Sequence, residues 1–148
     1  MDIAILADIS RSMKTEEREH LINVTKTLVD KVGVSEAGHH FGFVTFAVYV
    51  KLHSNFSNPS YYNADNLKDK MEYEVKVEPH TDETRLDLAM NVTLNELFSS
   101  DGGDRPNARN VLLVITDGNG VFINDTWDNR SEIQLSNFHE PLKVTISF

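Results

Sequence analysis

Continuous apolar runs mark the strands that this chain is expected to form. The runs at residues 2–7 and 110–116 are almost entirely aliphatic, which is typical of strands buried on both faces of a parallel sheet. Two further runs, at residues 41–46 and 48–53, are separated by a connection too short for a crossover. They therefore predict a pair of antiparallel strands. An apolar run at residues 142–148 predicts the last strand.

Segments with helical periodicity lie between these strands. Apolar residues recur at every third or fourth position in residues 16–32 and 85–98, and more weakly in residues 64–71. This alternation predicts an α/β fold with a doubly wound, mostly parallel sheet, helices on both faces and one antiparallel edge strand. In such sheets ligands bind at the carboxyl ends of the strands, where the strand order reverses.

The organisation of the chain indicates one domain. No repeat, low-complexity tract or linker divides the sequence, so we expect residues 1–148 to fold as a single unit. The opening MDIAILAD has neither the basic region nor the cleavage site of a signal peptide. We expect the chain to be a fragment of a larger protein, with any signal peptide outside it.

Charge and residue types exclude several classes of function. A formal net charge of -9 argues against nucleic acid and anionic membrane surfaces, which bind clustered Lys and Arg. No window approaches the ~18 consecutive apolar residues of a membrane span, so we expect no direct membrane insertion. Because the chain has no cysteine, thiolate metal sites, disulfides and thiol chemistry are excluded.

Two aspartates follow the two most apolar strands. Asp8 closes the first strand, and Asp117 lies in a Thr-Asp-Gly turn directly after residues 110–116. Because the carboxyl ends of parallel strands meet at one edge of the sheet, we expect these carboxylates to converge on one crevice.

The loop after the first strand adds hydroxyl groups to this crevice. In the run Asp8-Ile9-Ser10-Arg11-Ser12, alternation can point Asp8, Ser10 and Ser12 inward while Ile9 and Arg11 turn away. Carboxylate, hydroxyl and water oxygens are hard ligands that suit Mg²⁺, Mn²⁺ or Ca²⁺ rather than zinc or copper. The sequence therefore predicts a site for a hard divalent cation.

These residues resemble the metal-ion-dependent adhesion site (MIDAS) of the von Willebrand factor type A domains, which include the inserted domains of integrins. The signature of that family is Asp-x-Ser-x-Ser after the first strand, a threonine before a later helix and an aspartate in a Thr-Asp-Gly turn. Asp8-Ile-Ser10-Arg-Ser12, Thr84 and Thr116-Asp117-Gly118 match it in order. Residues 95–118 also resemble the run of the family from that helix into the fourth strand.

The resemblance implies a Rossmann-like fold and a role for each matching residue. Ser10 and Ser12 would bind the ion, Mg²⁺ in the first place, through their hydroxyls. Asp8 and Asp117 would act mainly through water, and Thr84 would bind the ion directly in the partner-bound form. Such an ion keeps much of its positive charge, so an exposed Asp or Glu of a protein partner can complete the octahedron. An extracellular matrix protein or a receptor would suit this adhesive, non-catalytic function.

The sequence also departs from the family pattern. Ile9 and Arg11 stand where small residues are usual, and Leu86 replaces a second threonine. The family normally continues past the fifth strand with further elements, so we expect a fold that is shortened at its carboxyl terminus.

Other features could face or modify a partner. Four residues near the expected ion are candidate partner contacts, namely Arg11, Glu83, Phe122 and Trp127. Phe122 and Trp127 could equally pack under their own loop. Five Asn-x-Ser/Thr triplets are candidate glycosylation sites; they begin at Asn23, Asn55, Asn91, Asn124 and Asn129. These sequons favour a secreted protein.

Simpler interpretations compete with the metal site. Ser10 or Ser12 could cap the following helix, and Thr84 with Asp87 resembles a capping box. We also expect His39 and His40 to be solvated in a turn.

Two other functions remain open. One is an intracellular type A domain that acts as a scaffold in a multiprotein assembly, in which case the sequons are accidental. The other is a Mg²⁺-dependent hydrolase of the haloacid dehalogenase type. That chemistry needs Asp-x-Asp after the first strand, whereas the second position here is Ser10.

Overall fold

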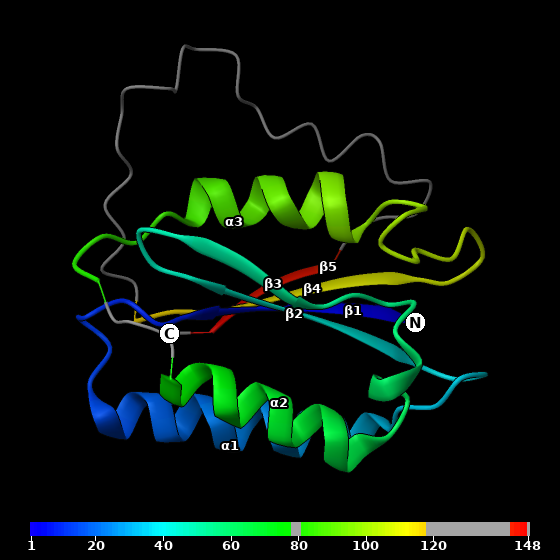
Figure 1. Cartoon of the computed structure of the whole chain (residues 1–148), viewed down its shortest axis with the longest axis horizontal. Helices are drawn as coiled ribbons and strands as arrows, with labels where there is room; N and C mark the ends of the chain where they lie inside the picture. Colours follow the sequence, from blue (N-terminus) through cyan, green and yellow to red (C-terminus); the bar gives the residue numbers. More distant parts are fainter. Residues whose placement is uncertain (78–80, 118–142, 148) are drawn as a thin grey trace.

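A five-stranded sheet lies between two layers of helices (Figure 1). The computed structural model describes residues 1–77, 81–117 and 143–147. Across the sheet the strand order is β3-β2-β1-β4-β5, with parallel pairing everywhere except between β2 and β3. The strands are β1 (Asp2–Asp8), β2 (His40–Phe46), β3 (Val50–Ser54), β4 (Asn110–Ile115) and β5 (Lys143–Ser147). The expected doubly wound sheet with an antiparallel edge strand is confirmed.

The helices cover both faces of the sheet. α1 (Thr15–Val32) and α2 (Ala64–Val77) lie on one face, and α3 (Leu86–Val92) lies on the other (Figure 1). A short 3-10 turn, η1 (Pro59–Tyr61), precedes α2. The prediction from periodicity ended this helix at Met71, which is too early. α2 continues well past Met71, with ion pairs that join Lys70 to Glu74 and Lys76 to Glu72.

α3 ends in a wider turn than the periodicity predicts. Residues 85–98 were expected to form one helix, but the last turn is a π-helix, η2 (Thr93–Leu97). The N–H of Phe98 donates to the carbonyl of Thr93 at 2.8 Å, and the Thr93 hydroxyl donates to the carbonyl of Ala89 at 2.8 Å. Among the described residues, no helix has both the length and the apolar character needed to cross a membrane.

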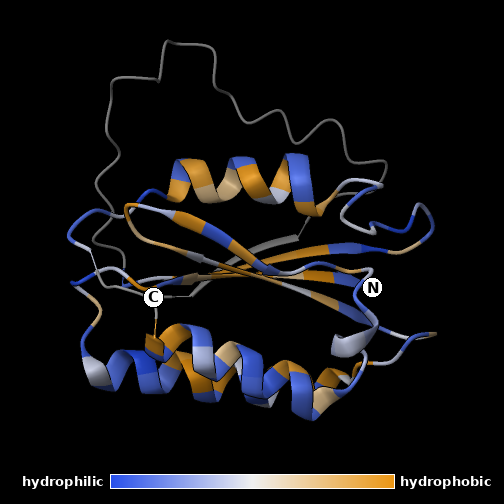
Figure 2. Cartoon of the chain, viewed as in Figure 1, coloured by the Kyte–Doolittle hydropathy of each residue, from blue (hydrophilic) through white to orange (hydrophobic). Residues whose placement is uncertain are grey.

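Alternate residues of the central strands supply two separate cores. Along β1, Ile3, Ile5 and Ala7 belong to the cluster that contains residues of α1 and α2, whereas Ala4 and Leu6 belong to the cluster that contains residues of α3. Every residue of β1 and β2 is buried. Figure 2 shows this apolar layer along the strands between the helices. The two-residue period of a strand therefore explains why the runs are continuously apolar.

His40 contradicts the expectation of a solvated turn. It is the first residue of β2 and only 5% exposed, and its ring stacks on Tyr62 with 4.5 Å between ring centroids. Its Nε2 lies 3.0 Å from the carbonyl oxygen of Glu36. The aromatic partner comes from a distant segment, which the local sequence did not reveal.

A buried polar network joins the edge of the sheet to α2. The His53 ring lies between the Thr45 hydroxyl, 2.6 Å from Nε2, and the Glu74 carboxylate, 3.2 Å from Nδ1. Lys70 donates to the same carboxylate. Burial raises the pKa of Glu74. Lys70 and His53 together lower it by more, so the net pKa is below the ordinary glutamate value. The ionised form of Glu74 therefore stabilises the fold.

Gly42 leaves room for α3 and η2 to approach the sheet. A Cβ atom at this position of β2 would lie 2.5 Å from Cδ2 of Leu97, which is fully buried. We expect Gly42→Ala to lower the free energy of unfolding by about 1–3 kcal/mol, because the buried leucine must shift within the core to make room for the added methyl group. Urea unfolding of the single variants and of Gly42→Ala/Leu97→Ala checks this. Strict additivity of the two single effects would show that the clash is absent.

Acid should weaken the fold through Glu74. Because the pKa of Glu74 is lower in the folded state than in the unfolded state, its contribution is complete above the ordinary pKa of about 4.3 and is lost as the pH falls below it. We expect Glu74→Gln to cost about 1–3 kcal/mol at neutral pH and to reduce the loss of stability on acidification. Urea midpoints measured from pH 7 to pH 3 test this, with Glu19→Gln on the exposed side of α1 as control. An unchanged pH dependence in Glu74→Gln would refute the assignment.

Candidate metal centre

The two predicted aspartates lie at the same edge of the sheet. Asp8 is the last residue of β1, and Asp117 follows β4, which pairs with β1 in parallel register with Ala7 opposite Ile115. β1 lies between β2 and β4, so the chain winds away from it in both directions at this point. This is the switch point at which doubly wound sheets bind ligands. The carboxyl ends of β1 and β4 lie at the left-hand end of the sheet in Figure 1.

Hydrogen bonds hold both oxygens of the Asp8 carboxylate. The backbone N–H of Ser10 donates to Oδ1 at 2.8 Å, and the Thr116 hydroxyl donates to Oδ2 at 2.7 Å. The aspartate is fully buried. Each carboxylate oxygen has a second lone pair, so the group can still accept from a water molecule. This geometry suits a carboxylate that acts by holding water near an ion.

The two serine hydroxyls lie side by side. Ser10 Oγ and Ser12 Oγ are 2.9 Å apart, and Ser10 is fully buried whereas Ser12 is exposed. Two neighbouring oxygens of an octahedral Mg²⁺ site are also separated by about 2.9 Å, since each lies 2.0–2.1 Å from the ion at a right angle. Ile9 turns into the core and Arg11 is exposed. The two serine hydroxyls thus lie together, whereas the side chains of Ile9 and Arg11 lie elsewhere.

Neither helix-capping interpretation agrees with the structure. The N-cap of α1 is Lys14, whose N–H donates to the Glu17 side chain at 2.7 Å, so Ser10 and Ser12 precede the helix without capping it. The N-cap of α3 is Arg85 rather than Thr84. Asp87 forms a bidentate pair with Arg85 at 2.8 and 2.7 Å, in place of the bond to Thr84 that a capping box requires.

Main-chain hydrogen bonds bring the Thr84 loop (residues 81–85) to the serine loop (residues 8–12). The N–H of Arg11 donates to the carbonyl of Thr81 at 2.8 Å. The Thr81 hydroxyl accepts from the N–H of Val48 at 3.0 Å, which ties the same loop to the turn after β2. Thr84 is 4% exposed within this loop. The sequence analysis missed Thr81, because its role depends on two loops that are distant in sequence.

The electrostatics of the site favour an added cation. Burial raises the pKa of Asp8; the hydrogen bonds from Thr116 and Ser10 lower it in part, and Asp117 raises it again by repulsion. The nearby cation Arg18 donates to the carbonyl of Ser10 at 3.1 Å, and its own pKa is lowered by burial in spite of its attraction to Asp8. The buried carboxylate of Asp8 therefore lies near a second carboxylate, that of Asp117, and Arg18 compensates part of its charge.

The donor set fits a hard divalent ion. The described residues contain no group of three or more His, Cys, Asp or Glu side chains placed to bind a metal. The oxygens that the described residues offer at this edge are the hydroxyl groups and the two carboxylates. Such all-oxygen sets are typical of Mg²⁺, Mn²⁺ and Ca²⁺.

The predicted partner contacts lie around this edge only in part. Arg11 forms an ion pair with Asp82 at 3.3 Å, and their side chains are 73% and 77% exposed. Glu83 is also exposed. Phe122 and Trp127 lie outside the described residues. Arg11 therefore points away from the serine hydroxyls and is neutralised by a residue of the Thr84 loop.

The candidate glycosylation sites lie at different places on the molecule. Asn23 and Asn91 are exposed on α1 and α3. Asn55 follows β3, is half-buried and accepts a hydrogen bond from the Ser57 hydroxyl at 3.3 Å. Asn124 and Asn129 lie outside the described residues.

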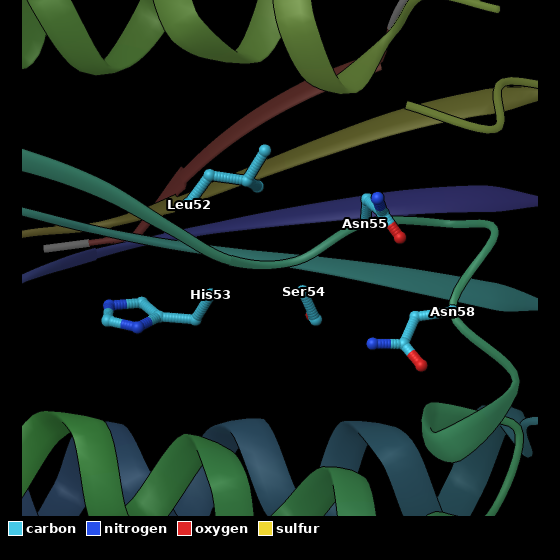
Figure 3. A pocket seen from close by; sticks show the side chains of 5 residues that line it. All are labelled: Leu52, His53, Ser54, Asn55 and Asn58. Carbon is cyan, nitrogen blue, oxygen red and sulfur yellow. The ribbon is translucent and has the colours of Figure 1, made fainter. Parts of the chain in front are cut away.

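A small pocket beside the edge strand is separate from these groups. It has a volume of about 160 Å³, and Figure 3 shows the side chains that line it: Leu52, His53, Ser54, Asn55 and Asn58. None of the five residues that were predicted to bind metal takes part. The pocket contributes nothing to the convergence of Asp8, Ser10 and Thr116.

Sequence comparison decides the family. The model of the von Willebrand factor type A domain matches residues 2–136. The chain belongs to the von Willebrand factor type A domain family. Matrilin-3 of Gallus gallus is 26% identical over 121 residues, which cover 80% of this chain and 26% of that protein.

Solved structures share the fold of this type A domain. One is proximal thread matrix protein 1 from the mussel byssus with a zinc-occupied MIDAS motif, at a TM-score of 0.68 and 22% identity over 81% of this chain and 31% of that one. Another is the manganese-loaded TRAP protein of Plasmodium vivax, at a TM-score of 0.70 and 17% identity over 81% of this chain and 47% of that one. The chain thus spans less than half of each of these proteins.

Thr116 should affect ion binding without touching the ion. We expect Thr116→Val, which removes the donor to Asp8 Oδ2 and keeps the shape of the side chain, to weaken Mg²⁺ binding about 10- to 100-fold. Calorimetric titration of Mg²⁺ into metal-stripped protein measures this, with Thr27→Val on the exposed face of α1 as the matched control. Unchanged affinity in Thr116→Val would contradict a positioning role for this hydroxyl.

Proposed function

We propose that this type A domain is a metal-dependent, non-catalytic adhesion module that binds an acidic side chain of a partner protein. The observation that carries the proposal is the pair of hydroxyls, Ser10 and Ser12, 2.9 Å apart beside the buried carboxylate of Asp8. Ser10, Ser12 and Thr84 would bind the ion, with Mg²⁺ as the first candidate and Mn²⁺ or Ca²⁺ as others. The bound ion would supply a Lewis-acidic positive charge at the surface.

The protein groups would keep that charge available to a partner. Asp8 accepts from Ser10 and Thr116, so its carboxylate is fixed and suited to orient water rather than to surround an ion. Ser10 and Ser12 bring no charge. A site with few direct carboxylates leaves the ion short of negative ligands, which favours an Asp or Glu from outside.

Catalysis finds less support in this arrangement. A hydrolase of the haloacid dehalogenase type needs a second aspartate as acid and base two residues after the first, and Ser10 stands there. A serine hydroxyl neither holds nor releases a proton readily near neutral pH, so the step that this chemistry requires has no group to perform it.

An extracellular or cell-surface location is part of the proposal. Two sequon asparagines, Asn23 and Asn91, are exposed on helices and have space for a glycan. The mussel relative in fold is a byssus matrix protein. An extracellular matrix protein or a receptor with an exposed Asp or Glu is therefore the partner we propose, and an intracellular scaffold has no observation in its favour.

The first experiment removes the two hydroxyls. Mg²⁺ is titrated into protein stripped with EDTA, for the wild type, for Ser10→Ala/Ser12→Ala and for the control Ser60→Ala/Ser100→Ala, whose serines are exposed and remote. We expect one-site binding that only the first double variant loses. At 100 times the dissociation constant the ion should stabilise the wild type by about 2.7 kcal/mol, which thermal melts detect. Equal binding by the Ser10/Ser12 variant would refute the proposed site.

Further arms of the same experiment test ion choice and location. Mn²⁺, Ca²⁺ and Zn²⁺ titrations rank the ions, and cooperative melting of each metal-free variant shows that it is folded. Mass spectrometry of the protein from its native source tests the sequons. Absence of any glycan would favour the intracellular scaffold.

A further inference from the structure

Three loops at the carboxyl edge of the sheet form one continuous platform. The N–H of Ile9 donates to the carbonyl of Phe46 at 2.9 Å, which joins the serine loop to the turn after β2. The N–H of Arg85 donates to the carbonyl of Ala47 at 2.8 Å, which joins the Thr84 loop to the same turn. With the bond from Arg11 to Thr81, each loop is held by the other two. We call residues 8–12, 46–49 and 81–85 the platform.

A tyrosine stands exposed on this platform. Tyr49 is 75% exposed, more than any other large hydrophobic residue that the structure describes, and its carbonyl accepts from the N–H of Ala47 at 3.0 Å. Its ring takes part in none of the aromatic pairs found among the described residues. The hydrogen bonds that fix this turn come from its backbone and from the Thr81 hydroxyl.

Hydrogen bonds on both sides place Tyr49 close to the candidate metal residues. Phe46 pairs with Asp8 in the parallel register of β1 and β2, and Val48 donates to Thr81. Tyr49 therefore directly follows Val48, which contacts the Thr84 loop. An exposed aromatic ring beside a charged centre is the kind of residue that dominates protein interfaces, because its burial releases much apolar surface.

The charges of the platform limit what can dock there. Asp82 and Glu83 are exposed, and Arg11, the exposed arginine of the platform, is already paired with Asp82. The whole chain also carries a formal charge of -9. A partner rich in carboxylates would be repelled both at long range and at the platform. One carboxylate for the ion, accompanied by apolar surface, is the complementary arrangement.

We infer that Tyr49 is the apolar anchor of the partner-binding surface, and that the partner presents a loop with a single Asp or Glu next to a large apolar side chain. This inference rests on the proposed function, since the carboxylate would go to the ion. It adds a specificity-determining residue that lies outside the metal-binding motif. The apolar contact supplies the selectivity that coordination of one carboxylate by an ion lacks.

The test uses a displayed library of short disulfide-closed peptides with a fixed central Asp and random flanking positions. Peptides are selected on immobilised wild type in Mg²⁺ and released with EDTA. We expect Phe, Trp, Tyr, Leu, Ile or Met to be enriched at one position near the Asp, and additional acids to be depleted. Selected peptides should bind Tyr49→Ala at least ~10-fold more weakly than the wild type.

A second tyrosine provides the matched control. Tyr73 is 60% exposed on α2 and lies outside the platform loops. Tyr73→Ala should bind the selected peptides as the wild type does, and melts of both variants should match the wild type because neither ring is buried. Equal affinity of Tyr49→Ala, or no apolar enrichment, would overturn the role of Tyr49 and leave the metal-dependent function standing. If no selected peptide needs both Mg²⁺ and the Ser10/Ser12 hydroxyls for binding, the role of Tyr49 and the metal-dependent function are both overturned.

Discussion

The burial of the Asp8 carboxylate at the end of β1 is the constraint that determines the structure of the site. A buried carboxylate is tolerated only if hydrogen bonds or opposite charge compensate for its lost hydration. Here the Ser10 N–H folds the following loop back over the carboxylate, and Thr116 brings in the end of β4. The serine loop and the Asp117 turn are therefore shaped by the same group that would orient water around an ion.

The sheet makes this arrangement possible because its central strands are buried on both faces. Parallel register sets Ala7 opposite both Thr45 and Ile115, so three strands reach their carboxyl edge together. The starting positions of the loops that follow these strands are therefore fixed by the sheet. The polar network of Thr45, His53 and Glu74 then attaches the edge strand to α2 just below the same edge.

Much of this could be predicted from the sequence, for physical reasons that differ between the elements. Apolar runs and helical periodicity are local, so the strands, the helices and the convergence of Asp8 with the end of β4 followed directly. Alternation in an extended loop also predicted that Ile9 would turn away from the crevice, and its side chain lies in the core. The end of α2 and the wide turn at Thr93 were missed, because ion pairs and a side-chain hydrogen bond to the backbone decide them.

The residues that support the site were harder to find. Arg18, Thr81 and Tyr49 carry no motif, and each acts through a contact with a segment far away in sequence or through its exposure. His40 looked like a turn residue until the ring of Tyr62 was seen to cover it. Local patterns identify side chains that share a chemistry, whereas such supporting roles are set by tertiary contacts.

The bonds that join the platform loops bear on how the domain can evolve as well as on how it binds. The three loops are joined largely through amide and carbonyl groups, to which side chains add the Thr81 hydroxyl and the exposed pair of Arg11 and Asp82. A bond between main-chain atoms survives almost any exchange of the side chains that project from it. Positions such as 11, 49 and 82 can therefore diverge freely while the loops stay in place. Descendants of one ancestral domain could acquire new binding preferences by point substitution, without a cost to folding at each step.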